Sequence, residues 1–261
     1  MTPTAASQAA AVLRSHWTTR TRVAAIPEAC RPTDRAEGYA VQAALAAAWG
    51  EPVVAWKIAA TSAAGQAHIG VDGPLAGRYL RDRVLGPGAS VPLDGNTMRV
   101  AEVEFAFRMA RDLPPRAGPY TLEETMAAVA SLHPSVEVPD SRYEDFVHAG
   151  APQLIADCAC ACWLVIGEAA PDGWRSIDLA AHPVRALIGG RGVAEGTGAA
   201  ALGDPRAALV WIANELRVHG PGLRAGEWVS TGTCVVPVPV SPGDAFTADY
   251  GSLGSLSLTL R

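Results

Sequence analysis

The only lysine of the chain lies in an apolar segment. Of the 21 basic side chains, 20 are arginine and one is Lys57, inside Val53–Ala60. Arginine stays charged at any working pH, whereas a desolvated lysine can have its pKa lowered toward neutrality and can then donate or accept a proton. The alternative is a packed lysine stem whose ammonium reaches water. We interpret Lys57 as a proton-transfer residue.

Two glutamates share one face of a predicted strand. In Val100–Phe107 the even positions carry Glu102 and Glu104 and the odd positions are apolar, so both carboxylates point to the same side. Glu137 follows in a second β-like segment, after a predicted helix that ends near Leu132. Three carboxylates converging from two strands would suit Mg²⁺ or Mn²⁺, with open positions for water and substrate. A solvated strand face is the alternative.

Composition narrows the class of protein. The 261 residues are 49% hydrophobic and 18% charged, which predicts a globular chain with one substantial core. A net charge of −5 argues against a nucleic-acid partner, and no apolar run is long enough to span a membrane. The five cysteines lack metal-binding spacing, so we expect buried thiols in a reducing cytoplasm.

Periodicity and capping signals predict helices early in the chain and strands later. The glycine-rich segment 189–198 lacks the spacing of a phosphate loop and predicts a turn between two strands. The predicted elements are a helix over 33–49, a strand over 53–60, a short helix over 61–69, loops and short strands over 71–93, the strand over 100–107, a helix from Thr121, a helix from Asp204 to Gly220, and strands beyond Gly226.

This order predicts a mixed α+β fold with a β-rich core and peripheral helices. Residues 1–50 would form a helical N-terminal region, and residues 51–261 a β-rich catalytic domain in one continuous globular unit.

Several short motifs occur in an order that resembles the fumarylacetoacetate hydrolase superfamily, in its branch of 2-keto-4-pentenoate hydratases and 4-oxalocrotonate decarboxylases. The resemblance extends over roughly residues 35 to 258. Its matching segments are Val54–Ile58, Glu102–Glu104, Val136–Arg142, Ile155–Asp157, Gly196–Trp211, Leu223–Gly226 and Ser230–Gly232.

The resemblance implies a β-rich fold around a divalent ion held by the three glutamates, with Lys57 beside it. Family substrates are small 2-oxo or 2-enol acids that chelate the ion through the C1 carboxylate and the C2 oxygen. Lys57 would move protons between enol and keto forms, and Thr231 and the Gly232 amide would donate to the substrate carboxylate. It further implies a homo-oligomer, at least a dimer.

One loop departs from the family pattern. Many hydratases of this branch carry an acid in a P-D-x-G loop, where this chain has Pro74-Leu75-Ala76-Gly77. Asp82, a few residues on, matches another acidic position of the family and would serve as the acid. The nearby Arg78, with Arg81, would either bind a second substrate carboxylate or be plain surface charge.

The expected activity is hydration of a 2-hydroxypenta-2,4-dienoate-type acid to a 4-hydroxy-2-oxo acid in aromatic catabolism. Three alternatives stay open. The first is decarboxylation of a 2-oxo-3-hexenedioate, and the second is C–C hydrolysis of an acylpyruvate or fumarylacetoacetate-type acid, for which His133 and His148 lack an evident acidic partner in the sequence. The third is a non-catalytic subunit that docks with an active paralogue, although such a subunit has no need to keep three unneutralised carboxylates together.

Overall fold

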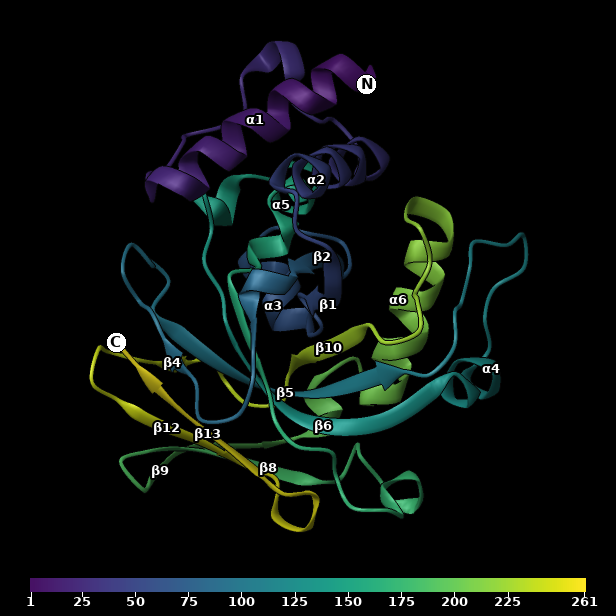
Figure 1. Ribbon diagram of the computed structural model, residues 1–261, viewed down its shortest axis with the longest axis vertical. Helices are drawn as coiled ribbons and strands as arrows, with labels where there is room; N and C mark the ends of the chain where they lie inside the picture. The colour runs from purple at the N-terminus through teal and green to yellow at the C-terminus, as the bar shows by residue number, and fades with distance from the viewer.

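The computed structural model describes all 261 residues and contains two β-sheets with helices around them (Figure 1). The larger sheet has the strand order β2-β1-β10-β5-β6-β7-β3, and β11 pairs with β5 beside this path. Its strands are β1 Val53–Ala59, β2 Leu75–Leu80, β3 Val84–Leu85, β5 Val100–Met109, β6 Val129–Val138, β7 Trp163–Ile166, β10 Trp228–Thr233 and β11 Val238–Pro239.

The smaller sheet has the order β4-β13-β12-β8-β9 and lies below the larger one in Figure 1. Tyr250 joins the two layers, because its hydroxyl donates to the carbonyls of Glu104 and Ser135 and its ring packs edge-on against Phe105. The strands are β4 Ser90–Val91, β8 Pro183–Ile188, β9 Arg191–Thr197, β12 Ala245–Asp249 and β13 Ser255–Leu260.

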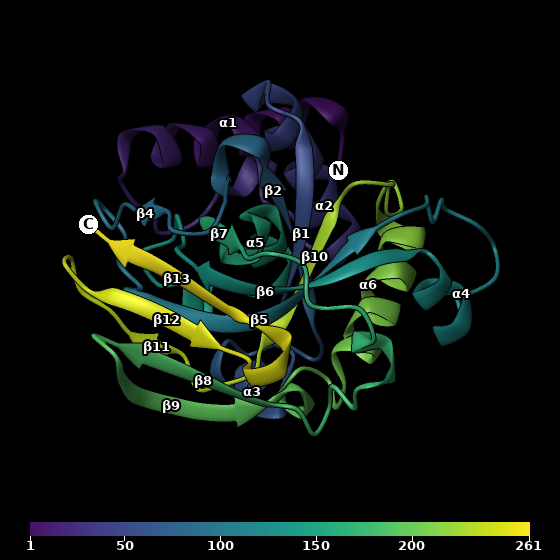
Figure 2. The same cartoon turned by 60° about the horizontal axis from the view of Figure 1, so that its bottom comes forward.

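Six α-helices surround the sheets. In Figures 1 and 2 the two N-terminal helices cover one side of the molecule, and α6 lies with α4 at another. No helix is both long and apolar enough to cross a membrane. The helices are α1 Pro3–Thr19, α2 Arg35–Trp49, α3 Ala63–His68, α4 Leu122–Ala127, α5 Ala151–Ala156 and α6 Pro205–His219.

Capping side chains set the helix ends near the predicted positions. The side chain of Asp34, rather than that of Thr33, caps α2 by accepting from the Glu37 amide, and α2 ends at Gly50 with φ 85°. The helix predicted from Thr121 is α4, and a capping box between Thr121 and Glu124 fixes its start. The glycine-rich segment forms the β8–β9 hairpin predicted from its spacing.

The predicted boundary between α4 and the following strand is wrong. The helix ends at Ala127 instead of near Leu132, and β6 begins at Val129. The cause is pairing between strands, because β6 pairs with β5 over most of its length, from Met109 opposite Val129 to Glu102 opposite Glu137. The strand that carries Glu137 is therefore longer than the sequence pattern indicates.

The five cysteines are buried and free, as expected. Cys158, Ala159 and Cys160 form a left-handed turn with φ of 52°, 51° and 64°. Such a run is costly for residues other than glycine. It is held by neighbouring contacts, among them the buried ion pair of Arg142 with Asp157.

Candidate active site

Strand register brings the three glutamates together. Glu102 on β5 lies directly opposite Glu137 on β6, and Glu104 lies opposite Ser135. Because residues two apart on a strand share a face, all three side chains point to the same side of the larger sheet. Each offers an oxygen within 4.8 Å of the others. The predicted convergence of the E-x-E pair with Glu137 is confirmed.

Lys57 lies against this group of carboxylates. Its Nζ atom is 2.5 Å from Oε1 of Glu137, and the Tyr79 hydroxyl donates to the same oxygen at 2.9 Å. Lys57 is placed there by β1, which runs parallel to β10 with Lys57 opposite Ser230. The lysine side chain is only 4% exposed, so it is a buried partner of the carboxylates.

Glu104 is oriented from the other side by β10. Its Oε2 atom accepts from the Ser230 hydroxyl at 2.6 Å and from the Gly232 amide at 3.0 Å. The remaining oxygens, Oε1 of Glu104 and Oε2 of Glu137, are buried without a hydrogen-bond partner. A buried carboxylate oxygen without a partner is costly. The two free oxygens and Glu102 form a set of hard ligands that fits a divalent cation.

The local charges shift the pKa values of this group. Burial, with Glu137 adding to it, raises the pKa of Glu102 to about 7. Burial also raises the pKa of Glu104 well above its usual range, helped by Glu137 and Glu102. Burial by itself lowers the pKa of Lys57. The neighbouring carboxylates, Glu137 above all, raise it by more than burial lowers it, so the pKa of Lys57 lies above its ordinary value. The pKa near neutrality expected for Lys57 is therefore wrong for the protein alone.

Glu102 faces a cavity of about 830 Å³ with largely apolar walls, whereas Glu104 and Glu137 lie behind its lining. Lys57 and Glu102 line it beside the group of carboxylates. The only basic side chains on its walls are Lys57 and His68, and His68 is exposed. The main apolar lining residues are Ile58, Ile69, Met98, Val100, Phe146, Val235 and Val236.

Thr231 and Gly232 do not line this cavity. The Thr231 hydroxyl donates to the carbonyl of Phe105 at 3.0 Å, and the Gly232 amide is engaged by Glu104. Thr61 lines the cavity instead. It packs so closely on Gly232, whose φ is +102°, that a Cβ there would lie 2.4 Å from the Thr61 Oγ1 atom. Thr61 was missed in the sequence, although it follows the strand of Lys57 by two residues.

Arg78 is buried on another side of the sheet. Its guanidinium lies 4.9 Å from the ring centre of Trp56 and donates to Gln42 at 3.0 Å. The register explains this, because Lys57 pairs with Gly77 whereas Arg78 pairs with Trp56, and neighbouring residues on a strand face opposite ways. Neither Arg78 nor Arg81 is among the cavity-lining residues, so the cavity gives no support to a contact with a second carboxylate.

Asp82 also lies outside the cavity. It is exposed in the 3₁₀ turn Arg81–Arg83 and accepts from Trp49 Nε1 at 3.3 Å. It lines a separate hollow of about 430 Å³ beside the N-terminal helices. This position does not favour Asp82 as the acid for a reaction at the glutamates.

The two histidines considered for C–C hydrolysis are likewise elsewhere. His148 does have an acidic partner, Asp145 at 2.8 Å, but both side chains are exposed. His133 contacts Ser131 and the carbonyl of Gly167, and burial lowers its pKa. The histidine on the cavity wall is His68, whose ring packs edge-on against Phe146.

Comparison with known proteins identifies relatives over nearly the whole chain. The chain is 34% identical over 250 residues to a 2-keto-4-pentenoate hydratase of Paraburkholderia phymatum, covering 95% of this chain and 94% of the relative. No family model matches the chain.

Solved structures agree with this relationship. A 4-oxalocrotonate decarboxylase from Pseudomonas putida G7, complexed with magnesium and adipate, superposes with a TM-score of 0.88 at 28% identity, covering 100% of this chain and 99% of that one. A fumarylpyruvate hydrolase from Pseudomonas aeruginosa in complex with Mn²⁺ and pyruvate is 15% identical over 80% of this chain and 90% of its own, with a TM-score of 0.56, and shares the fold. The chain therefore belongs to the fumarylacetoacetate hydrolase superfamily, in the branch of the 2-keto-4-pentenoate hydratases.

Proposed function

We propose that the protein is a divalent-metal-dependent hydratase, which adds water to a 2-hydroxy-2,4-dienoate and gives a 4-hydroxy-2-oxo acid. The observation that carries the proposal is the group of three glutamates with two unpartnered buried oxygens beside Lys57, which reaches an apolar cavity through Glu102 and Lys57. Hydratase relatives at about one-third identity support the type of reaction.

Glu102, Glu104 and Glu137 would hold Mg²⁺ or Mn²⁺. A bound ion of this kind supplies Lewis acidity toward the carboxylate and C2 oxygen of a 2-oxo acid. Ser230 and the Gly232 amide fix one Glu104 oxygen, and Lys57 and Tyr79 fix one Glu137 oxygen. The remaining oxygens are thereby held ready to act as ligands.

Lys57 and Thr61 would act on the substrate from the cavity wall. The Lys57 ammonium is the cavity-lining group able to supply and recover the proton that moves between enol and keto forms. The Thr61 hydroxyl has no hydrogen-bond partner within the chain and is a free donor for the substrate carboxylate. No nucleophilic side chain is required.

The cavity favours an acid with a single carboxylate. Apolar walls accept the hydrocarbon end of a dienoate, whereas a second carboxylate there would be desolvated without an arginine to pair with it. We therefore propose monocarboxylic dienoates as the substrate class.

The experiment is a panel assay of the purified protein with Mn²⁺ or Mg²⁺. We expect 2-hydroxypenta-2,4-dienoate to lose its ultraviolet absorbance and yield a hydrated product, and chelation of the metal to stop the reaction. Absence of turnover for every dienoate at saturating metal would overturn the proposal.

Decarboxylation of a 2-oxo-enedioate is the second candidate. It is favoured by the full-length structural similarity to a 4-oxalocrotonate decarboxylase. Release of CO₂ from 4-oxalocrotonate without hydration of pentadienoate would support it, and the opposite pattern would support hydration.

A further inference from the structure

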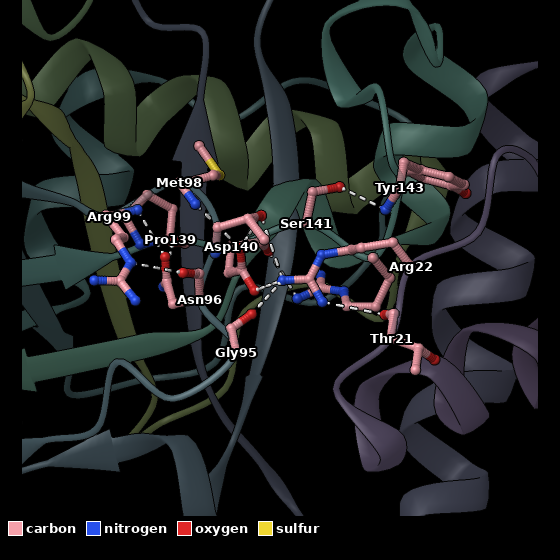
Figure 3. Close-up of polar contacts among 12 residues, drawn as sticks. Thr21, Arg22, Gly95, Asn96, Met98, Arg99, Pro139, Asp140, Ser141 and Tyr143 are labelled. Carbon is pink, nitrogen blue, oxygen red and sulfur yellow. Dashed lines mark hydrogen bonds and ion pairs between the residues drawn. The ribbon is translucent and has the colours of Figure 1, made fainter.

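Asp140 joins three separate parts of the chain just beyond the end of β6. One carboxylate oxygen accepts from the Thr97 amide at 2.9 Å, from the Thr97 hydroxyl at 3.0 Å and from the Met98 amide at 3.4 Å. The other oxygen is paired with Arg22. Figure 3 shows Asp140 between Arg22 on one side and the segment of Asn96 and Met98 on the other. We call Asp140 with Arg22, Thr97 and Met98 the Asp140 clamp.

The segment held by the clamp has little other regular structure. Arg99 has a left-handed backbone with φ 47°, which is unfavourable for a residue other than glycine. Asn96 supports this turn, because its side chain accepts from the Arg99 amide at 2.7 Å and donates to the Pro139 carbonyl at 2.9 Å. Between its end contacts with Leu93 and Val240, the backbone of residues 96–99 is therefore held by Asp140 and its neighbour Pro139.

The clamped segment forms a wall of the catalytic cavity. Thr97, Met98 and Pro139 all line it, and the chain continues from Met98 into β5, which carries Glu102. Asp140 itself follows Glu137 by three residues. The clamp thus connects the ends of the two strands that supply glutamates with the wall between them.

Arg22 belongs to the N-terminal region, far along the chain from these strands. Besides Asp140 it donates to the Gly95 carbonyl at 2.6 Å and to the Thr97 hydroxyl at 3.4 Å, and the next residue, Val23, pairs with Tyr143. Both side chains of the pair are largely buried, Arg22 being 13% and Asp140 8% exposed. Buried pairs of this kind are screened less by salt than surface pairs. The N-terminal region therefore supplies the Arg22 guanidinium that pairs with Asp140 beside the cavity wall.

We propose that Asp140 is a positioning residue for the substrate, holding the Thr97–Met98 wall in place, and that Arg22 fixes the Asp140 carboxylate in the orientation this requires. The inference rests on the proposed function, because it assigns the wall to the substrate of that site. Neither Asp140 nor Arg22 belongs to the group of metal-binding glutamates. We therefore expect their substitution to weaken substrate binding more than metal binding.

The test compares Asp140→Ala, Asp140→Asn and Arg22→Gln at saturating Mn²⁺, with steady-state kinetics on a dienoate. Asp140→Ala removes every contact that the Asp140 carboxylate makes, and we expect KM to rise about tenfold or more, as for loss of a charge-assisted contact. Asp140→Asn keeps an oxygen for Thr97 and Met98 and should recover most of this loss. Arg20→Ala is the matched control, because the Arg20 guanidinium forms one ion pair, an exposed one with Asp94, and its kinetics should be unchanged.

The double variant Arg22→Gln with Asp140→Asn tests the coupling. If Arg22 acts through Asp140, the double variant should be no worse than the poorer single variant. Fully additive effects would overturn the role of Arg22, and this comparison remains available if Asp140→Ala fails to fold. A wild-type KM in folded Asp140→Ala would overturn the role of Asp140, since a purely structural residue would lower the melting temperature and leave KM unchanged.

Hydrogen exchange gives a readout that does not depend on activity. The amides of Thr97 and Met98 should exchange at least about tenfold faster in Asp140→Ala than in the wild type, as expected when a protecting hydrogen bond is lost. If the wild type turns over no dienoate, but the Thr97 and Met98 amides still exchange faster in Asp140→Ala, the proposed function is wrong and the clamp is supported. Unchanged exchange would overturn the clamp whatever the activity.

Discussion

Glu102 and Glu137 lie directly opposite each other on neighbouring strands, with the Lys57 ammonium paired to Glu137. Like charges in this relation destabilise a sheet, and one lysine cannot neutralise three carboxylates. Burial raises the pKa of Glu102 and of Glu104, and the charge of Glu137 raises both further. The site is therefore under a repulsion that a divalent cation would relieve.

Metal should stabilise the protein measurably. At a hundredfold excess over its Kd, a cation that binds only the folded state adds about 2.7 kcal/mol to the free energy of unfolding, which corresponds to a rise of several degrees in Tm. Glu137→Gln should abolish the rise seen by differential scanning fluorimetry with Mn²⁺. Glu123→Gln, at an exposed acid on α4, should keep it. No thermal shift and no calorimetric binding at millimolar metal in the wild type would contradict the metal site.

The chemistry of Lys57 can be separated from its charge. Lys57→Arg keeps a cation beside Glu137 but removes a titratable amine, so turnover should fall by about 10² or more, the usual range for loss of a general acid or base. Circular dichroism should show a retained fold. Equal kcat in the variant and the wild type would mean that the ammonium serves only to balance the glutamates.

Thr61, rather than Thr231, should affect substrate binding. Thr61→Val removes the free hydroxyl while keeping the shape, and we expect KM to rise roughly five- to tenfold, as for one lost hydrogen bond of about 1 to 1.5 kcal/mol. Thr61→Ser should stay near the wild type. A Thr61→Val protein with unchanged KM would remove Thr61 from the binding site.

Arg78 should matter for stability and little for specificity. Arg78→Met leaves the Gln42 side chain without one partner and removes the stacking on Trp56. The free energy of unfolding, measured by chemical denaturation, should therefore fall by about 1 to 3 kcal/mol. Its kcat/KM for a monocarboxylic dienoate should stay within about threefold of the wild type once folded protein is compared. A selective loss of activity on a dicarboxylic acid would instead restore Arg78 as a substrate contact.

The sequence predicts the chemistry of the site better than its geometry. Alternation along 100–107 is enough to put Glu102 and Glu104 on one face, because strand periodicity is local. Which residue of β6 lies opposite Glu102 depends on the register between strands far apart in the chain, and only the structure supplies it. The extent of β6 was underestimated for the same reason, since its first residues are strand only through pairing with β5.

The positions of Arg78, Asp82 and Thr231 depend on tertiary structure. Arg78 and Lys57 are on neighbouring strands, but the β1–β2 register points them to opposite sides. Asp82 is carried away from the cavity by the 3₁₀ turn after β2. The sequence analysis names Thr231 as the hydroxyl donor, whereas the structure places Thr61 on the cavity wall and turns the Thr231 hydroxyl to the carbonyl of Phe105.

The most direct test of the central claim is identification of the product by NMR. The protein is dialysed to remove any bound metal and is then supplied with Mg²⁺, which avoids the paramagnetic broadening that Mn²⁺ causes. The wild type should convert 2-hydroxypenta-2,4-dienoate to 4-hydroxy-2-oxopentanoate. The Glu137→Gln protein should yield none. Formation of the hydrated product at equal rates with and without metal, or its complete absence from the wild-type reaction with Mg²⁺, would contradict a divalent-metal-dependent hydratase.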